Sequence, residues 1–380
     1  MAPIARADLI ARNLDEVLTR ADLDALIASG TPLRHYIGFE ISGKIHLGTG
    51  LVCMGKVKDF ADAGVECTIF LADWHSWIND KLGGDRDQIR RMSVDYFAEG
   101  LKASFRALGG DPARLKFVLG TDLYHNADAY WATVIDVSKN TTLARMQRSV
   151  TILGRKEGES LDFAKLLYPA MQVADIYYQG VNIAHAGMDQ RKAHVIARDV
   201  ASKMRVSPLK DAAGRQVAPV CVHHPLLLGL NKPAQWPPPN EGADRDAVSD
   251  FVSSMKMSKS ARQSALFIHD SEDEVRQKVR KAFCPPDNAR YNPVLDWARK
   301  LIFARDGEFI VRRSPDHGGD TRFGDAAELE EAFLSGALHS ADLKNAVADW
   351  LVDTLAPARA AFASKDAQSL IAELDTLISR

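Results

Sequence analysis

The residues HYIGFEISGKIHLGTG, numbered 35–50, decide the fold of the amino-terminal part of this chain. The first six, 35–40, have the composition of a β-strand, and a helical pattern follows the ISGK turn from about His46 onward. A helix that begins directly after a strand offers unpaired N–H groups and about half a positive charge, which together bind phosphate. We therefore predict a phosphate site in which His46 donates and Gly48 and Gly50 let a ligand approach the backbone. An ordinary helix start has the same pattern.

Further segments of strand composition alternate with helical patterns. They are 65–73, 115–120, 181–187 and 217–224. This alternation is typical of a parallel sheet covered by helices. We therefore predict an α/β fold, a Rossmann-like doubly wound parallel-sheet domain over 1–288. An all-α domain without strands is expected over 289–380, and an amphipathic helix over 1–20.

The composition excludes several classes of protein. The 380 residues include 48 basic and 50 acidic side chains, a net charge of −2, which excludes a binder that relies on bulk positive charge. Four cysteines form no CxxC pair, so reduced thiols and no protein-held metal are expected. No apolar run of about 18 residues occurs, and the amino terminus lacks a secretory signal. No membrane contact and a cytoplasmic location are therefore expected.

A second phosphate signal lies in the loop 253–262, some 210 residues after the first. It consists of Lys256, Met257, Ser258, Lys259 and Ser260. Two lysines three residues apart, separated by hydroxyl side chains, suit a mobile clamp for a highly charged leaving group. A plain solvated loop has a similar composition. The preceding segment, 231–254, has four prolines within seven residues and predicts an irregular insertion.

Together the two signals, in this order and in an α/β context, resemble the class I aminoacyl-tRNA synthetases. The flanking blocks narrow the resemblance to the tyrosyl-tRNA synthetases of the archaeal and eukaryotic type. They are YIGFEISGKIHLGTG (36–50), LADWHSW (71–77), YPAMQVADIYYQG (168–180), GMDQRKAHVIARD (187–199), HPLLLGL (224–230) and LHSADLKNAVADWL (338–351). The resemblance implies a catalytic domain with a connective insertion at about 121–165, followed by a helical anticodon-binding domain.

The resemblance implies a tyrosine pocket. Tyr168, Gln172 and Asp175 are spaced to project from one side of a helix, where a core hydrogen-bond network is an alternative explanation. By resemblance, Asp175 and Tyr36 hold the phenolic hydroxyl of the substrate. Tyr168, Gln172 and Gln190 hold its α-amino group. Phe70 and His75 complete the wall, although His75 is nearly as well explained as a core histidine.

The reaction implied is attack of the tyrosine carboxylate on the α-phosphate of ATP, followed by transfer to the terminal adenosine of tRNA(Tyr). Catalysis then rests on alignment and charge stabilisation by His46, Thr49, Lys256 and Lys259. The ATP contacts implied are Gly48, Gly187, Asp189, Lys256, Met257, Ser258, Lys259 and Ser260. Mg²⁺ is expected to accompany ATP on its phosphates. Asp189 is also a candidate cap for the following helix.

The resemblance also implies partners. The segment 139–156 has five basic residues and no acidic one, and 191–215 has seven basic against two acidic. Both suit contacts with tRNA phosphates, or a solvated helix face. The carboxyl-terminal region is acidic, so His339 and Asp342 are expected to read the anticodon through individual base contacts, unless they cap a helix. A homodimer is expected by resemblance alone.

Two departures keep other functions open. Thr49 stands where the family has the second histidine of its HIGH motif, and 231–254 lengthens the approach to the lysine loop. A hydroxyl still donates a hydrogen bond, so altered rather than lost activity is expected. A relative that binds tRNA or nucleotide without completing aminoacylation is the second hypothesis. A tryptophan-specific enzyme is the third.

Overall fold

The computed structural model describes residues 5–154, 162–233, 235–238, 251, 254–257 and 264–378. Its centre is a six-stranded sheet in the order β1-β6-β5-β2-β3-β4. The strands are β1 (Glu16–Leu18), β2 (Arg34–Phe39), β3 (Glu66–Leu71), β4 (Leu115–Leu119), β5 (Ile183–Gly187) and β6 (Val220–His224). Neighbouring strands from β6 to β4 are parallel, and β1 alone is antiparallel. The five predicted strands are confirmed.

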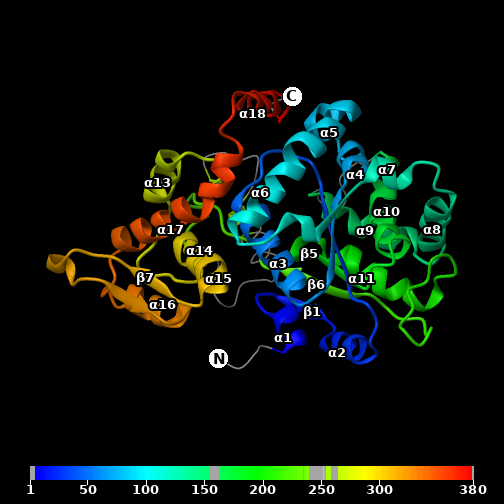
Figure 1. Cartoon of the computed structure of the whole chain (residues 1–380), viewed down its shortest axis with the longest axis horizontal. Coiled ribbons are helices and arrows are strands. Elements are labelled where there is room, and N and C mark those ends of the chain that lie inside the picture. The colour runs from blue at the N-terminus through cyan, green and yellow to red at the C-terminus, as the bar shows by residue number, and fades with distance from the viewer. Residues whose placement is uncertain are drawn as a thin grey trace.

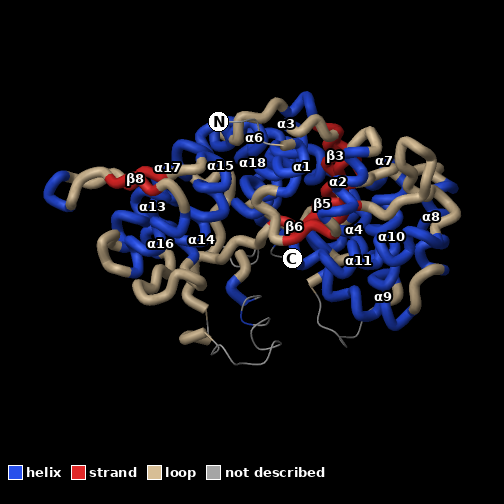
Figure 2. Tube along the Cα trace, turned by 90° about the horizontal axis from the view of Figure 1, so that it is seen from below, coloured by secondary structure: helices blue, strands red, loops and turns tan. Residues whose placement is uncertain are grey.

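Helices cover both faces of this sheet (Figure 1). They are α1 (Arg6–Ala11), α2 (Arg20–Ala28), α3 (Met54–Asp62), α4 (Asp73–Ile78), α5 (Arg86–Met92), α6 (Glu99–Ala107), α7 (Gly120–Tyr124), α8 (Asp128–Lys139), α9 (Leu143–Ser149), α10 (Ala164–Tyr178) and α11 (Arg191–Val200). In both views α3 and α6 lie on one side of the strands, and α4, α10 and α11 lie on the other (Figure 2). The doubly wound α/β fold is confirmed, and burial of both faces explains why β5 and β6 are buried at every position.

The amino terminus corrects the sequence analysis. A helix was expected over 1–20, but α1 ends at Ala11 and residues 16–18 form the edge strand β1. β1 pairs with β6, with Glu16 opposite His223. The Glu16 carboxylate also binds Arg191 at 2.8 Å. These partners lie some 175 residues or more further along the chain, so local periodicity could not indicate the strand.

The carboxyl-terminal region is mainly helical. Its helices are α13 (Glu272–Lys281), α14 (Pro293–Trp297), α15 (Ala304–Asp306), α16 (Ala326–Leu334), α17 (Ser340–Ala361) and α18 (Lys365–Ile378). Ser271 and Glu274 form a capping box at the start of α13. A short hairpin of β7 (Phe309–Val311) and β8 (Thr321–Phe323) was not expected. Its three-residue strands are too short to leave a periodic signal.

Packing joins this region to the sheet domain. α17 lies against both α13 and α6, so the two regions share one apolar core. None of the four cysteines, all of which are described, forms a disulfide, and Cys53, Cys67 and Cys221 are buried. Within the described residues, no helix is long and apolar enough to cross a membrane.

The sheet domain buries an unusual number of histidines. Burial lowers the pKa of His35, His75 and His194 to about 3 and that of His224 to about 4. An unfolded histidine takes up a proton near its usual pKa of about 6.5, while these remain neutral. Their contribution to stability is therefore complete above about pH 6.5 and is lost as the pH falls towards 4.

We accordingly expect the melting temperature to fall by about 5 °C or more between about pH 7 and pH 5.5, before most carboxylates titrate. Thermal unfolding followed by circular dichroism measures this shift. The interval above about pH 7.5 is the control, because the imidazoles are then neutral in both states. A flat or rising profile on acidification would contradict the prediction.

Candidate functional site

Backbone pairing brings the two phosphate signals together. Residues 45–47 run beside 266–268: Leu47 N–H donates to the Leu266 carbonyl at 3.0 Å, and Ile268 N–H donates to the Ile45 carbonyl at 3.0 Å. His46 forms the bridge between them, opposite Phe267. The segment that follows the lysine loop is therefore held by an antiparallel bridge against the loop that precedes α3.

The helix after His46 begins with a wide turn, Gly48–Cys53, that continues into α3. The His46 ring folds back over this start, where the Thr49 N–H donates to its Nδ1 at 3.4 Å. Thr49 is buried, whereas His46 and Gly48 are partly exposed. His46 and the first N–H groups of the helix are thus presented together at the loop surface.

Gly48 and Gly50 have different reasons to be glycine. A Cβ on Gly48 would approach only the His46 ring, at 2.9 Å. A Cβ on Gly50 would lie 2.3 Å from Ile268 Cγ2 and 3.0 Å from Ser104 Oγ. The expectation that Gly50 gives a ligand access to the backbone is therefore corrected, because Gly50 serves the packing of the core.

The lysine loop is described only at its start. Met255–Met257 lies beside 227–229, with Met257 N–H donating to the Leu227 carbonyl at 2.8 Å. The Lys256 ammonium binds Asp189 Oδ2 at 2.5 Å. The other predicted residues of this loop, Ser258, Lys259 and Ser260, lie outside the described residues.

Gly187 is the last residue of β5, and Asp189 lies in the turn that follows it. A Cβ on Gly187 would lie 2.6 Å from Asp189 Oδ1 and 3.3 Å from His224 Nε2, so a side chain does not fit there. Asp189 makes no cap for α11, whose cap position is Gln190. Its carboxylate instead holds Lys256, which removes capping as the alternative explanation.

A hydrogen-bonded row of imidazoles lies beneath this end of the sheet. His35 Nε2 is 3.1 Å from His185 Nδ1, and His185 Nε2 is 2.9 Å from His224 Nδ1. His224 Nε2 reaches Cys53 Sγ at 3.2 Å. The row connects β2, β5 and β6 to the helix that follows His46, so it fixes the position of this helix relative to the sheet.

A second cluster, on the other side of β2, contains the predicted tyrosine-binding residues. Asp175 of α10 is fully buried and accepts a hydrogen bond from the Tyr124 hydroxyl at 2.9 Å. His75 Nε2 lies 3.7 Å from its second oxygen, Oδ2. The Phe70 ring lies among those of Tyr36, His75 and Tyr124, at 5.7, 6.3 and 6.1 Å, and the Tyr168 ring meets His75 edge-on at 4.5 Å.

Burial dominates the electrostatics of this cluster. It raises the pKa of the Asp175 carboxyl well above its usual range, against the lowering effect of the Tyr124 hydrogen bond. Burial and the nearby Asp175 carboxylate also raise the pKa of Tyr36. Among the described residues, Asp175 Oδ2, Gln172 Oε1 and both His75 nitrogens have no hydrogen-bond partner. Buried polar atoms without partners are costly, so a set of them in one place indicates a polar ligand.

Gln172 and Gln190 close the cluster on the side of α11. Gln172 Nε2 is 3.4 Å from Gln190 Oε1, and Gln190 Nε2 donates to the Ile152 carbonyl at 2.9 Å. All seven residues predicted for tyrosine are therefore in one region. Tyr124 was missed: no spacing relates it to Asp175, 51 residues away, and only the fold brings α7 against α10.

The two predicted anticodon residues are at the start of α17, in the other region. The Ala341 N–H donates to His339 Nδ1 at 3.2 Å, so His339 caps this helix. Asp342 lies in its first turn, where a carboxylate is favoured by the helix dipole. Capping accounts for His339 without excluding contact with RNA.

Comparison with known proteins connects these features. The model of the family "tRNA synthetases class I (W and Y)" matches residues 28–356. The chain belongs to this family. Tyrosine--tRNA ligase of Thermococcus sibiricus is 54% identical over 359 residues, 94% of each chain. The predicted resemblance and the class I fold are thereby confirmed.

Solved structures agree. Tyrosyl-tRNA synthetase of Pyrococcus horikoshii, complexed with L-tyrosine, matches with a TM-score of 0.92 and 51% identity over 98% of each chain. Tryptophanyl-tRNA synthetase of Aeropyrum pernix matches with a TM-score of 0.65, 18% identity and coverage of 93% of this chain and 84% of that one, which shows a common fold alone. The similarity within this class I family is therefore to the enzymes for tyrosine.

The contrast between the two glycines gives a test of the loop geometry. Gly50→Ala forces a methyl group into Ile268, and such overpacking costs about 2 kcal/mol, so we expect a melting temperature lower by about 3 °C. Gly48→Ala is the matched control, with a change within about 1 °C, because the partly exposed His46 ring can rotate away. Equal losses in the two variants would contradict this geometry.

Proposed function

We propose that this protein is a tyrosine–tRNA ligase, which converts L-tyrosine and ATP to tyrosyl-adenylate and pyrophosphate and then transfers tyrosine to the 3′-terminal adenosine of tRNA(Tyr). One observation carries the choice of amino acid: the buried Asp175 carboxyl, with Tyr124 on one oxygen and, among the described residues, no partner on the other. Family membership supports the class of reaction. The choice of amino acid is the part of the proposal that depends on the residues around Asp175.

Tyrosine is recognised through its hydroxyl. Asp175 and Tyr36 hold that group at the closed end of the pocket, beside Phe70 and His75. Phenylalanine would leave their polar atoms unpaired, a form of selectivity for which tyrosine-activating enzymes are the established example. Tyr168, Gln172 and Gln190 hold the α-amino group. The indole N–H of tryptophan could donate to Asp175 but cannot accept a hydrogen bond from Tyr36, which argues against the third hypothesis.

ATP binds across the ends of β2 and β5. His46, Thr49 and the backbone at Gly48 hold the phosphates, while Gly187 and Asp189 hold the ribose. Lys256, together with Met257, Ser258, Lys259 and Ser260 of its loop, stabilises the charge that develops on pyrophosphate. The Asp189–Lys256 ion pair supports this arrangement because it holds one lysine of the loop at the ribose end.

Mg²⁺ accompanies ATP. In sites of this kind it is bound by substrate phosphates and water with at most one or two carboxylates. Asp189 is a partly exposed carboxylate in the right region. Within the described residues, no group of three or more His, Cys, Asp or Glu side chains is placed to hold a metal ion. The ion would supply charge neutralisation during the first step.

The tRNA lies along the basic segments 139–156 and 191–215, and His339 and Asp342 contact the anticodon. Among the described residues of these segments, four guanidinium groups are engaged within the chain, by Glu16, Asp22, Asp199 and Asp211. The contact with phosphate therefore falls mainly to the remaining cations. We propose the division into a catalytic domain, 1–288, and an anticodon-binding domain, 289–380, and a cytoplasmic location.

A homodimer is proposed, with its interface on the connective insertion at about 121–165. Trp131 and Ile135 share one face of α8 and are exposed, Ile135 by 59%. Leu143, Phe163 and Leu167 of the neighbouring helices are exposed as well. Large apolar side chains exposed close together usually mark an interface.

Amino-acid-dependent ATP–pyrophosphate exchange, measured with each of the twenty amino acids, tests the function. We expect exchange with tyrosine alone, and charging of tRNA(Tyr) in a second assay. In Asp175→Asn an amide replaces an acceptor oxygen, so kcat/KM for tyrosine should fall about 10- to 100-fold. Exchange with none of the amino acids would refute the proposal, and exchange without charging would favour the second hypothesis.

Asp136→Asn is the matched control for that variant. Asp136 is also a buried carboxylate, but its Oδ2 accepts from two backbone N–H groups, those of Arg205 and Val206, away from the pocket. We expect it to lower stability with KM for tyrosine unchanged. An equal rise in KM for tyrosine in both variants would show that the effect of Asp175→Asn is general.

The proposed interface is tested by Ile135→Glu. A charge within an apolar interface should raise the dimer dissociation constant about tenfold or more, measured by light scattering over a dilution series. Ile310→Glu is the control, since Ile310 is exposed by 42% on β7, in the carboxyl-terminal region. A wild-type monomer, or a dimer weakened equally by both substitutions, would refute this interface.

A further inference from the structure

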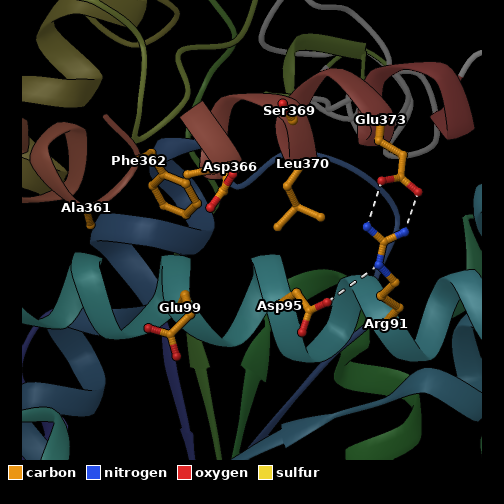
Figure 3. A pocket seen from close by; sticks show the side chains of 10 residues that line it. Arg91, Asp95, Glu99, Ala361, Phe362, Asp366, Ser369, Leu370 and Glu373 are labelled. Atoms are coloured by element: carbon orange, nitrogen blue, oxygen red, sulfur yellow. Dashed lines mark hydrogen bonds and ion pairs between the residues drawn. The ribbon is translucent and has the colours of Figure 1, made fainter. Parts of the chain in front are cut away.

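The last helix of the chain returns to the catalytic loop. α18 lies along α5, at the edge of the sheet domain (Figure 1). Two ion pairs connect it there: Arg91 binds both oxygens of Glu373, at 2.5 and 2.8 Å, and Lys44 binds Asp375 at 2.8 Å. A cavity of about 470 Å³ lies between α18 and the helical run that continues from α5 through residues 93–98 into α6, and is lined in part by Asp95, Leu370 and Glu373 (Figure 3). α18 also buries Ile371, Leu374 and Leu377 in the apolar core, so the two ion pairs are specific connections on a helix that is already packed.

Lys44 belongs to the turn that leads into His46. Its ammonium lies 5.6 Å from the centre of the Phe267 ring, and Phe267 is the residue that pairs with His46. The Lys44 side chain is only 16% exposed and that of Asp375 30%, whereas Arg91 and Glu373 are 46% and 36% exposed. The Lys44–Asp375 pair is thus the better shielded from solvent, and its attraction is less screened.

A second connection reaches the next residue of the same turn. Phe362, at the end of α17, packs against Tyr96 and His269, with ring centres 5.4 and 5.5 Å apart. The Tyr96 hydroxyl accepts a hydrogen bond from the Ile45 N–H at 3.0 Å and lies 3.0 Å from His269 Nε2. Phe362 is buried, so the Tyr96 ring that holds Ile45 is backed by the carboxyl-terminal region.

Two independent routes therefore run from the carboxyl-terminal helices to the residues just before His46. We propose that Asp375 and Phe362 are positioning residues for the phosphate loop, and that ATP binding in the activation step requires the last helix. The inference rests on the proposed function only in naming ATP as the ligand of His46. Asp375 acts through Lys44, and Phe362 acts through Tyr96. Neither touches the substrates.

The test compares two carboxylates on one helix. Asp375 and Glu373 both join α18 to the sheet domain, but only Asp375 reaches the phosphate loop. Tyrosine-dependent ATP–pyrophosphate exchange is measured without tRNA in Asp375→Asn and in Glu373→Gln. We expect Asp375→Asn to raise KM for ATP about fivefold with KM for tyrosine within twofold, and Glu373→Gln to change neither. Asp375→Glu, which keeps the charge, should recover most of the loss.

Three results would overturn the inference. They are an unchanged KM for ATP in Asp375→Asn, an equal rise in Asp375→Asn and Glu373→Gln, or an equal rise in the KM values for ATP and tyrosine. Melting temperatures of all variants separate positioning from docking, because loss of docking lowers stability in both variants alike. Exchange by the wild type in the same assay separates the proposed function from the inference. If the wild type shows no exchange, the proposed function is refuted. If the wild type is active, the KM values of the variants test the inference.

Discussion

The pairing of residues 45–47 with 266–268 is the constraint on which the proposed nucleotide site depends. These segments are more than 200 residues apart, and backbone hydrogen bonds fix their register independently of the side chains. Phe267 lies opposite His46 in this pairing, and a separate pairing of 255–257 with 227–229 holds the start of the lysine loop where Lys256 meets Asp189. Gly50 allows this close packing, since any side chain there would collide with Ile268. A site that stabilises a moving charge needs its cations on a rigid frame, and this pairing provides one.

The cluster around Asp175, the proposed tyrosine site, is held together by different interactions. Its geometry is fixed by aromatic packing around Phe70, and its chemistry by a single carboxyl group that burial makes costly to ionise. Tyr124 offsets part of this cost through one oxygen, and a substrate hydroxyl is suited to offset the rest through the other. The incompletely satisfied Asp175 carboxyl is thus the source both of selectivity for a ligand with a hydroxyl and of a free-energy cost in the ligand-free protein. A polar group left incompletely satisfied destabilises the free protein and discriminates most strongly against a ligand that lacks the matching group.

Local patterns in the sequence predict those elements whose signals lie within a few residues of each other. The five parallel strands, the helix after His46 and the capping box at Ser271 all have signals within a few residues, and the structure agrees with them. The predicted tyrosine residues also came together, and all of them except Phe70 belong to a block with a recognisable family pattern. β1, the β7–β8 hairpin and Tyr124 were not predictable in this way. Each owes its place to partners distant in sequence or to strands of three residues. Gly50 was misassigned for the same reason, since its constraint comes from Ile268.

Contacts between residues distant in sequence also connect the two ends of the chain. Lys44, Tyr96 and Phe362 carry no motif, yet they connect the last two helices to the loop that holds His46. A loop that must place one imidazole and several N–H groups against phosphate gains from support on both sides. The sheet and its row of histidines support this loop from beneath, and Asp375 and Phe362 support it on the outer side. Since the outer support comes from the region that also holds His339 and Asp342, a shift of α17 or α18 on binding tRNA would be transmitted to the phosphate loop through contacts that already exist.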